Sequence, residues 1–284
     1  MSNSLFNLKI GIAGLGLIGG SIYKTLLEKG FKNLYALTSN NETKTEIISK
    51  GYIASDNAEI LKDCNLIFIC SPISQTAYTV KQCFEINKSA IFVDVASLKE
   101  EILNEIETNM PDCKFIGSHP MAGTENSGFN ASFNGLFQNA NWVIIPSKKV
   151  TDDDVNTLKE IITVLGAKFI ELPAKEHDKA VALISHTPML LSQALMLASL
   201  NNDKALSLAA SGFRDMTRLS MSNKVMANDM LNLNKHNIRE TLTIVIDEAK
   251  KLLNSEYFNE NIDKIIETRK NLYDESGKNK YKNN

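Results

Sequence analysis

Gly14-Leu15-Gly16-Leu17-Ile18-Gly19 is the segment from which the fold of this chain can be inferred. It has the spacing G-x-G-x-x-G, it follows an apolar run at residues 8–13, and it begins a helical pattern over residues 17–28. In a dinucleotide-binding βαβ unit the first glycine permits a tight turn, and the second lets the pyrophosphate approach the backbone. The third allows the helix to pack closely on the strand. We therefore predict that residues 14–19 bind the phosphates of a dinucleotide at the N-terminus of this helix.

Further apolar runs of strand length follow this segment and alternate with helical patterns. They occupy residues 34–37, 66–70, 90–95, 114–117 and 142–145, and a helix with an acidic first turn is expected at 152–165. Continuous apolar runs of this length are typical of parallel strands that are covered on both faces. The βαβα alternation indicates an α/β fold with a Rossmann-type doubly wound sheet.

The pattern changes after Pro173. From residue 174 to about residue 270 there is no strand pattern, and apolar residues recur at helical spacing. Residues 225–253 contain neither proline nor glycine. We predict a dinucleotide-binding domain at 1–172 and an all-helical substrate and dimerisation domain at 173–284. The helices carry more apolar residues than a domain of this size needs for its own core, so we expect a homodimer through the helical domain.

Composition limits the function classes. The chain has 284 residues, 43% of them hydrophobic and 23% charged, as expected for a globular protein with a sizeable core. With 31 Lys and Arg against 33 Asp and Glu there is no basic excess to bind nucleic acid. Residues 181–200 are apolar, but His186 and Pro188 favour a buried core helix over a membrane span. Four cysteines without a C-x-x-C pair indicate buried thiols in a reducing compartment, so we expect a cytoplasmic protein.

Two segments at the ends of predicted strands are candidates for cofactor contacts. An acidic residue normally binds the adenosine ribose of NAD at the end of the second strand, where this chain has Thr38, Ser39 and Asn40. Because no acid is present to repel a 2′-phosphate, the sequence leaves NAD and NADP open and slightly favours acceptance of NADP. Ser71-Pro72 follows the strand at 66–70, either as a further cofactor contact or as a plain strand-to-helix turn.

A polar, glycine-bearing loop carries the main candidate for chemistry. It reads Ser118-His119-Pro120-Met121-Ala122-Gly123-Thr124-Glu125-Asn126-Ser127-Gly128. A histidine in such a loop, after a predicted strand, can accept a proton near neutral pH, so His119 is the expected active-site base. Ser97 follows the strand at 90–95 and fits either a helix N-cap or a hydroxyl that hydrogen-bonds this histidine.

The other histidines and the two neighbouring arginines are less specific. His177 begins a helical pattern and suits a capping or structural role, and His236 lies in a polar stretch typical of the surface. His186 is either a satisfied core group or part of a kink that lines a pocket. No pair of histidines has metal-ligand spacing, so we predict no metal site. Arg214 and Arg218 fit either surface ion pairs or a carboxylate-binding site.

Taken together, these motifs resemble the prephenate and arogenate dehydrogenases of tyrosine biosynthesis. The matching segments are residues 14–21, 94–97, 119–125, 184–188 and 212–218, in the order found in that family. The resemblance implies a Rossmann domain, a helical dimerisation domain, a cleft between them, and NAD or NADP as cofactor. It also implies oxidative decarboxylation of a cyclohexadienol to a phenol.

The resemblance also assigns roles to individual residues. By that match His119 accepts the hydroxyl proton, Ser97 orients the site, and Arg218 binds the ring carboxylate. The pocket would be completed by His186, Thr124 and Glu125, with Asp215 organising its helical side. Many members carry a tryptophan where this chain has Ala227, so one wall of the pocket differs.

The implied activity is prephenate dehydrogenase, with an arogenate or dual-substrate cyclohexadienyl dehydrogenase as the alternative. A 3-hydroxyacid dehydrogenase or imine reductase of the same architecture is disfavoured, because the loop at His119 is not typical of those enzymes. A dinucleotide-sensing protein without catalysis is disfavoured by the presence of Ser97, His119 and Arg218 together.

Overall fold

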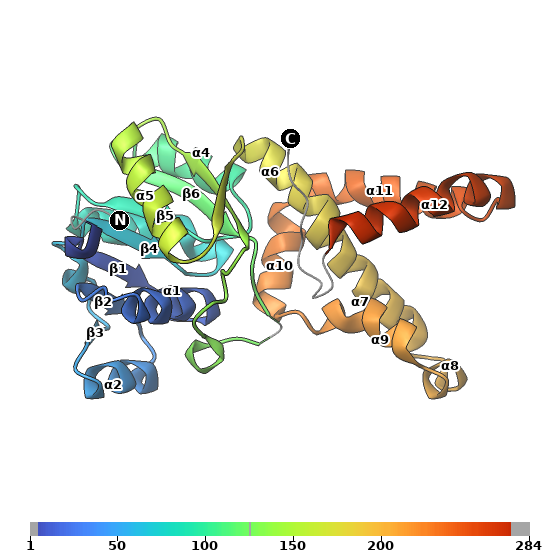
Figure 1. Cartoon of the computed structure of the whole chain (residues 1–284), viewed down its shortest axis with the longest axis horizontal. Coiled ribbons are helices and arrows are strands. Elements are labelled where there is room, and N and C mark those ends of the chain that lie inside the picture. Colours follow the sequence, from blue (N-terminus) through green and yellow to red (C-terminus); the bar gives the residue numbers. More distant parts are fainter. Residues whose placement is uncertain (1–4, 125, 274–284) are drawn as a thin grey trace.

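The computed structural model describes residues 5–124 and 126–273 and consists of a sheet-containing lobe and a helical lobe (Figure 1). Within the described residues, eight strands form one sheet in the order β3-β2-β1-β4-β5-β6-β7-β8. The strands are β1 Ile10–Ala13, β2 Leu34–Leu37, β3 Ile53–Ser55, β4 Leu66–Ile69, β5 Ile91–Asp94, β6 Phe115–Pro120, β7 Asn141–Pro146 and β8 Lys168–Glu171. The helices of this lobe are α1 Leu17–Glu28, α2 Asn41–Ser49, α3 Thr76–Ile86, α4 Glu100–Asn109 and α5 Asp152–Val164.

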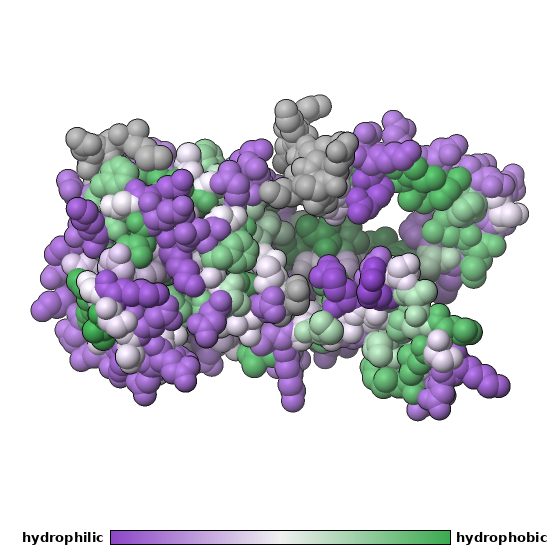
Figure 2. Space-filling model, turned by 60° about the horizontal axis from the view of Figure 1, so that its bottom comes forward, coloured by the Kyte–Doolittle hydropathy of each residue, from purple (hydrophilic) through white to green (hydrophobic). Residues whose placement is uncertain are grey.

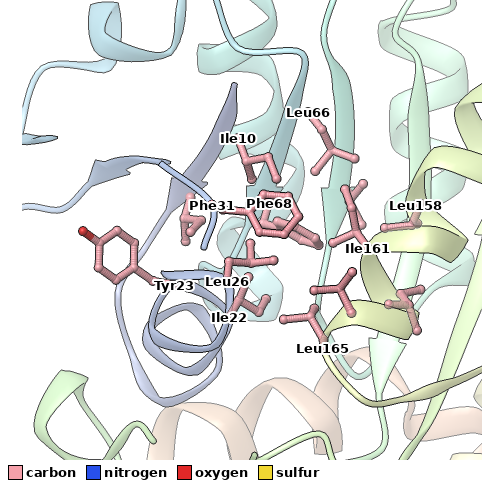
Figure 3. Close-up of a cluster of buried hydrophobic side chains, with 14 of the residues drawn as sticks. Ile10, Ile22, Tyr23, Leu26, Phe31, Leu66, Phe68, Leu158, Ile161 and Leu165 are labelled. Carbon is pink, nitrogen blue, oxygen red and sulfur yellow. The ribbon is translucent and has the colours of Figure 1, made fainter. Parts of the chain in front are cut away.

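Helices cover both faces of the sheet, which confirms the doubly wound prediction. Alternate residues of β4 point to opposite faces, because side chains alternate along a strand. Leu66 and Phe68 pack in one apolar cluster with side chains of α1 and α5, as Figure 3 shows for Ile22, Leu26 and Leu158. The other two residues of β4 pack with side chains of α3 and α4 in a second cluster.

The last two strands run opposite to the first six. Strands β1 to β6 are all parallel, β7 is antiparallel to β6, and β8 is parallel to β7. Between β6 and β7 the described residues contain only a short 3-10 turn, Phe129–Ala131, instead of a crossover helix. The chain therefore turns back after β6 and forms β7 antiparallel to it. Helix α5 is the crossover connection from β7 to the parallel strand β8. This antiparallel return and the short strands β3 and β8 were not predicted from the sequence.

The chain after β8 is helical, as predicted. Its α-helices are α6 Ala174–Val181, α7 Thr187–Ser199, α8 Asp203–Ser207, α9 Ser211–Thr217, α10 Lys224–Leu233, α11 Lys235–Lys251 and α12 Ser255–Leu272. A π-helical turn, Ala182–His186, joins α6 to α7, and a 3-10 turn, Arg218–Met221, follows α9. The uninterrupted pattern at 225–253 is broken at Asn234, between α10 and α11, because the side chain of this residue bonds to groups of the α6–α7 segment.

The helical lobe leaves much apolar surface open. Of the 23 large hydrophobic side chains that are exposed among the described residues, 17 lie after residue 173. Figure 2 shows large apolar areas over this lobe. The helical run Ala174–Ser199 has the length and the apolar composition of a segment that could cross a membrane. In the structure, 33% of the 18-residue stretch tested in this run is buried. The expected burial of this segment is thus met only in part: Val181 and Met189 are buried, whereas Ile184 and Leu197 are exposed.

Candidate active site

The glycine segment after β1 has the geometry that a dinucleotide requires. Gly14 has a φ of +99°, and a Cβ there would lie 2.8 Å from the carbonyl oxygen of Cys70, the residue after β4. A Cβ on Gly19 would collide with the Gly14 carbonyl oxygen, whereas the space around Gly16 is open. Helix α1 has no side-chain cap at its N-terminus. Its free N–H groups and the open space at Gly16 therefore fit a bound pyrophosphate.

The end of β2 offers hydroxyl and amide groups to the adenosine side. Thr38 is buried, and its Oγ1 accepts a hydrogen bond from the Asn40 backbone N–H at 3.2 Å. Asn40 caps α2 by accepting from Thr43 N at 2.8 Å, and Ser39 is exposed beside it. Lys44 Nζ lies 2.7 Å from the carboxylate of Asp56. Lys44 is the basic side chain that could bind a 2′-phosphate at this end of β2, and in the structure it is engaged in an ion pair.

The turn after β4 connects the cofactor side to the helical lobe. Ser71 Oγ is buried and has no hydrogen-bond partner among the described residues, whereas Pro72 is exposed. Asp229 of α10 accepts hydrogen bonds from Ser74 N at 3.1 Å and from Ser74 Oγ at 2.9 Å. These two hydrogen bonds hold the turn against the helical lobe. The Ser71 hydroxyl takes no part in them and is available to a ligand.

His119 is the penultimate residue of β6 and lies at the same carboxyl edge of the sheet as the glycine segment. Its side chain is half-buried, and its Nδ1 lies 2.9 Å from Nε2 of the buried His177 on α6. The other ring nitrogen of His177, Nδ1, lies 2.7 Å from Oδ1 of Asp178. The three side chains form a line from the sheet edge into the helical lobe. His177 and Asp178 were not predicted as site residues.

Asp178 bonds to both lobes. Its carboxylate accepts the backbone N–H of Lys99 at 2.9 Å and the backbone N–H of Glu100 at 2.9 Å. These are N-terminal groups of α4, a helix without a side-chain cap from its own N-cap residue. A carboxylate at this position is favoured by the helix dipole. Asp178 therefore caps a helix of the nucleotide lobe while it holds His177.

A fully buried ion pair lies beneath His119. Lys99 Nζ pairs with Asp94 at the end of β5 and donates to the Ser118 carbonyl oxygen at 2.7 Å. Ser118 N donates to Asp94 Oδ1 at 2.8 Å, and Trp142 Nε1 donates to Ser118 Oγ at 2.9 Å. Burial raises the pKa of Asp94 and lowers that of Lys99, each opposed by the charge of its partner. These bonds fix the backbone immediately before His119.

The pKa of His119 is shifted well below its usual value of 6.5. Burial is the largest cause, followed by the neighbouring His177, Lys99 and His186. At neutral pH the imidazole is therefore uncharged and can accept a proton.

His186 lies in the π-helical turn and is fully buried. Its Nδ1 is 3.0 Å from Nδ2 of Asn234, and its Nε2 has no partner among the described residues. Burial lowers the pKa of His186 to about 4, so this ring is neutral. Ser97 Oγ is also buried without a partner in the part of the chain that the structure describes. The expected bond from Ser97 to His119 is thus not present among the described residues.

The remaining candidates lie on exposed segments. Thr124 is exposed and accepts from Asn126 N at 3.3 Å, and Glu125 lies outside the described residues. Arg218 is exposed at the first position of the 3-10 turn that follows α9. Asp215 is exposed and lies 3.3 Å from Arg214 Nε, a surface ion pair in this structure.

The fold and this site define a dinucleotide-dependent oxidoreductase with a neutral histidine at the edge of the cofactor domain. Residues 22–171 match the family model described as prephenate dehydrogenase, nucleotide-binding domain. Residues 173–271 match the model described as prephenate dehydrogenase, dimerization domain. The chain belongs to the prephenate dehydrogenase family, and its sheet-containing lobe is the nucleotide-binding domain of that family.

Individual relatives agree with this assignment. The chain is 30% identical to prephenate dehydrogenase of Bacillus subtilis, over 85% of this chain and 68% of that protein. It is 35% identical to that of Lactococcus lactis, over 78% of this chain and 64% of that protein. The solved structure of Synechocystis arogenate dehydrogenase is similar, with a TM-score of 0.77 at 29% identity, covering 92% of this chain and 97% of that one. The chain thus spans about two thirds of the length of the two curated relatives.

Proposed function

We propose that this protein converts prephenate to 4-hydroxyphenylpyruvate by oxidative decarboxylation in tyrosine biosynthesis, with NAD or NADP as hydride acceptor. The observation that carries the proposal is the position of His119, a neutral imidazole at the sheet edge that also holds the dinucleotide segment. The prephenate dehydrogenases of two bacteria at 30% and 35% identity supply the substrate class.

The chemistry follows from the groups at this edge. Bound at the glycine segment, NAD(P) would supply the acceptor for the hydride that leaves the ring carbon carrying the hydroxyl. His119 holds the hydroxyl proton at the ring nitrogen that His177 does not contact. The bond between the ring and its carboxylate breaks, its electron pair enters the ring, and CO2 leaves. The proton then returns from His119 to the oxygen, and the product is a phenol.

Groups on both lobes would hold the substrate. Arg218 is suited to the ring carboxylate because a guanidinium binds a carboxylate through two parallel hydrogen bonds. The buried and unpartnered Ser97 Oγ and His186 Nε2 are suited to substrate oxygens, because buried polar groups without partners are rare in the absence of a ligand. Thr124, Glu125 and Asp215 are kept as proposed pocket residues.

Arogenate is the alternative substrate, since it differs from prephenate only in its side chain. The Zymomonas mobilis cyclohexadienyl dehydrogenase, 25% identical over 86% of this chain and 86% of that protein, and the Synechocystis arogenate dehydrogenase structure favour keeping it. Steady-state turnover of the purified protein with each substrate and each cofactor decides between them. No turnover with either substrate would exclude the proposed reaction.

The rate of this reaction should depend on pH through His119. Because the pKa of His119 is well below 6.5, we expect kcat/KM to stay constant from neutral pH to well below pH 6.5. It should fall only where the imidazole becomes protonated. Initial rates across this range measure the acid limb. A midpoint at or above pH 6.5 would show that the reacting base is a different group or is less buried.

The cofactor preference should respond to a carboxylate at the end of β2. We expect Thr38→Asp to shift preference towards NAD, since the new carboxylate can accept from the ribose 2′-hydroxyl and repels a 2′-phosphate. The ratio of kcat/KM for NAD to that for NADP is the measurement, with the exposed Ser49→Asp on α2 as a control of equal charge. An unchanged ratio would show that Thr38 does not face the ribose.

We also propose a homodimer through the helical lobe and a cytoplasmic location, with the domain boundary between residues 172 and 173. The match to a dimerization domain and the exposed apolar side chains of this lobe support the dimer. Light scattering that gives the mass of a single chain would contradict it. The four free cysteines support a reducing compartment, and recovery of the protein with membranes would contradict the location.

A further inference from the structure

We propose that His177 and Asp178 are positioning residues that fix the tautomer of His119, leaving its Nε2 as the free base. The inference rests on the proposed function in that it takes His119 as the base of the reaction. Neither residue would touch the substrate. They would act through the line of contacts from Asp178 to His177 and from His177 to His119.

The assignment of protons begins at Asp178. Its two oxygens accept backbone N–H groups of Lys99 and Glu100, so it faces His177 as a carboxylate, which can only accept. The Nδ1 atom of His177, 2.7 Å from Oδ1, must therefore carry a proton. In a neutral imidazole the second nitrogen then has a lone pair, so His177 Nε2 is an acceptor.

The acceptor at His177 Nε2 in turn determines which nitrogen of His119 carries a proton. Its Nδ1 lies 2.9 Å from His177 Nε2, and an acceptor at that distance requires a proton on Nδ1 of His119. In the neutral ring, Nε2 is then unprotonated and can accept the substrate proton. Without this contact either nitrogen could carry the proton, and only one of the two tautomers is a base at Nε2.

The groups around the line include charges of both signs. Asp178 Oδ1 lies 2.7 Å from His177 Nδ1, while Lys99, paired with Asp94, and the neutral His186 lie near His119. The His177 ring itself is 1% exposed. A doubly protonated His177 would donate from Nε2 and force the proton of His119 onto the wrong nitrogen.

Asp178→Asn tests the line without removing its atoms. Oδ2 of Asp178 accepts both backbone N–H groups, from Glu100 at 2.9 Å and from Lys99 at 3.2 Å, so we expect the amide oxygen of the new residue at that place. The amide nitrogen then replaces Oδ1 beside His177 and donates to its Nδ1. His177 then carries its proton on Nε2 and donates to His119, whose Nε2–H form cannot act as a base. We expect kcat with prephenate to fall by about 10² to 10⁴, the range for loss of a general base, while KM changes little.

Asp154→Asn is the matched control. Asp154 is also a mostly buried carboxylate at a helix start, where it accepts from Thr151 N and Thr151 Oγ1, and its ion-pair partner is Lys114. Its loss should lower thermal stability as the loss of any cap does, but kcat should remain unchanged. An Asp178→Asn enzyme with kcat within about threefold of the wild type would overturn the positioning role.

A spectroscopic measurement tests the tautomers in the wild-type protein, so the proposal stands or falls even when the variant does not fold. The chain has four histidines, and two-bond ¹H–¹⁵N correlation spectra of ¹⁵N-histidine-labelled protein identify which ring nitrogen carries the proton. His119→Asn assigns the signal of His119. We expect Nδ1–H in both His119 and His177 of the wild type, and Nε2–H in both after Asp178→Asn.

The outcomes separate this proposal from the proposed function. Nε2–H in wild-type His119, or a cationic His177 near neutral pH, overturns the positioning role even when prephenate is turned over. A slow Asp178→Asn enzyme with unchanged tautomers overturns it too, because the loss then comes from the docking of α6 on α4. Failure of the proposed function appears instead as absence of turnover in a protein whose tautomers are as expected.

Discussion

His119→Asn is expected to abolish turnover of prephenate while the affinity for NAD(P) stays nearly unchanged. The imidazole is the group assigned to hold the hydroxyl proton, and loss of a general base typically lowers the rate by about 10² to 10⁴. The cofactor phosphates would be held by backbone N–H groups at Gly16 and the start of α1, which the substitution does not touch. Single-turnover rates and cofactor titration by fluorescence measure the two effects separately.

His236→Asn is the control for this substitution. His236 has a side chain that is 85% exposed, and its ion-pair partner is Glu240 on the same helix. The same chemical change there should leave turnover and cofactor affinity unaltered. If His119→Asn retained near wild-type turnover, His119 would have no part in the mechanism. His177 would then have no catalytic base to position.

Arg218→Lys is expected to raise KM for prephenate about 10- to 150-fold with cofactor affinity unchanged. Lysine keeps the positive charge but loses the planar fork and its second hydrogen bond to the ring carboxylate. A charge-assisted hydrogen bond contributes about 1.5 to 3 kcal/mol, which corresponds to that range of affinity. Steady-state kinetics at saturating cofactor measure the change. Because Arg218 is exposed, the substitution should not disturb the core.

Arg214→Lys serves as the internal control for the carboxylate site. Arg214 lies one turn earlier, is exposed, and pairs with Asp215 on the surface. The α-helix ends at Thr217 and continues as a 3-10 turn from Arg218, so the two arginines do not share one regular helical face. If Arg214→Lys raised KM and Arg218→Lys did not, the assignment of the carboxylate site would be reversed.

The local sequence was sufficient to predict the nucleotide domain. Its glycines are required at Gly14 by a positive φ and at Gly19 by the close approach of α1 to the preceding turn, both of which are short-range constraints. The strands β1, β2, β4, β5, β6 and β7 were recognisable as apolar runs. The strands β3 and β8 were missed because they lie at the two edges of the sheet, where their side chains are mostly or partly exposed. Such strands carry little apolar signal.

The candidate site was predicted in part. His119 was chosen as the candidate base because it follows a predicted strand, at the edge where Rossmann enzymes build their sites, and the structure places it near the end of β6 at that edge. His177 was interpreted as a capping or structural residue, since Glu176-His177-Asp178 at the start of a helix has no signal that distinguishes a buried partner of another histidine. The hydrogen bond from Ser97 to His119 is absent among the described residues, where Ser97 Oγ has no partner, and the role of Ser97 at the site stays a prediction.

The candidate dinucleotide segment and the candidate base could be proposed from local sequence, because a tight turn, a strand end and a helix start depend on residues close together in the chain. The tautomer and protonation of that base depend on contacts over long sequence separation. His177 lies 58 residues after His119, and Asp178 lies 79 residues after Lys99. These groups meet only when α6 docks on the N-terminus of α4, and burial in the folded chain is also the main reason that the pKa of His119 is lowered.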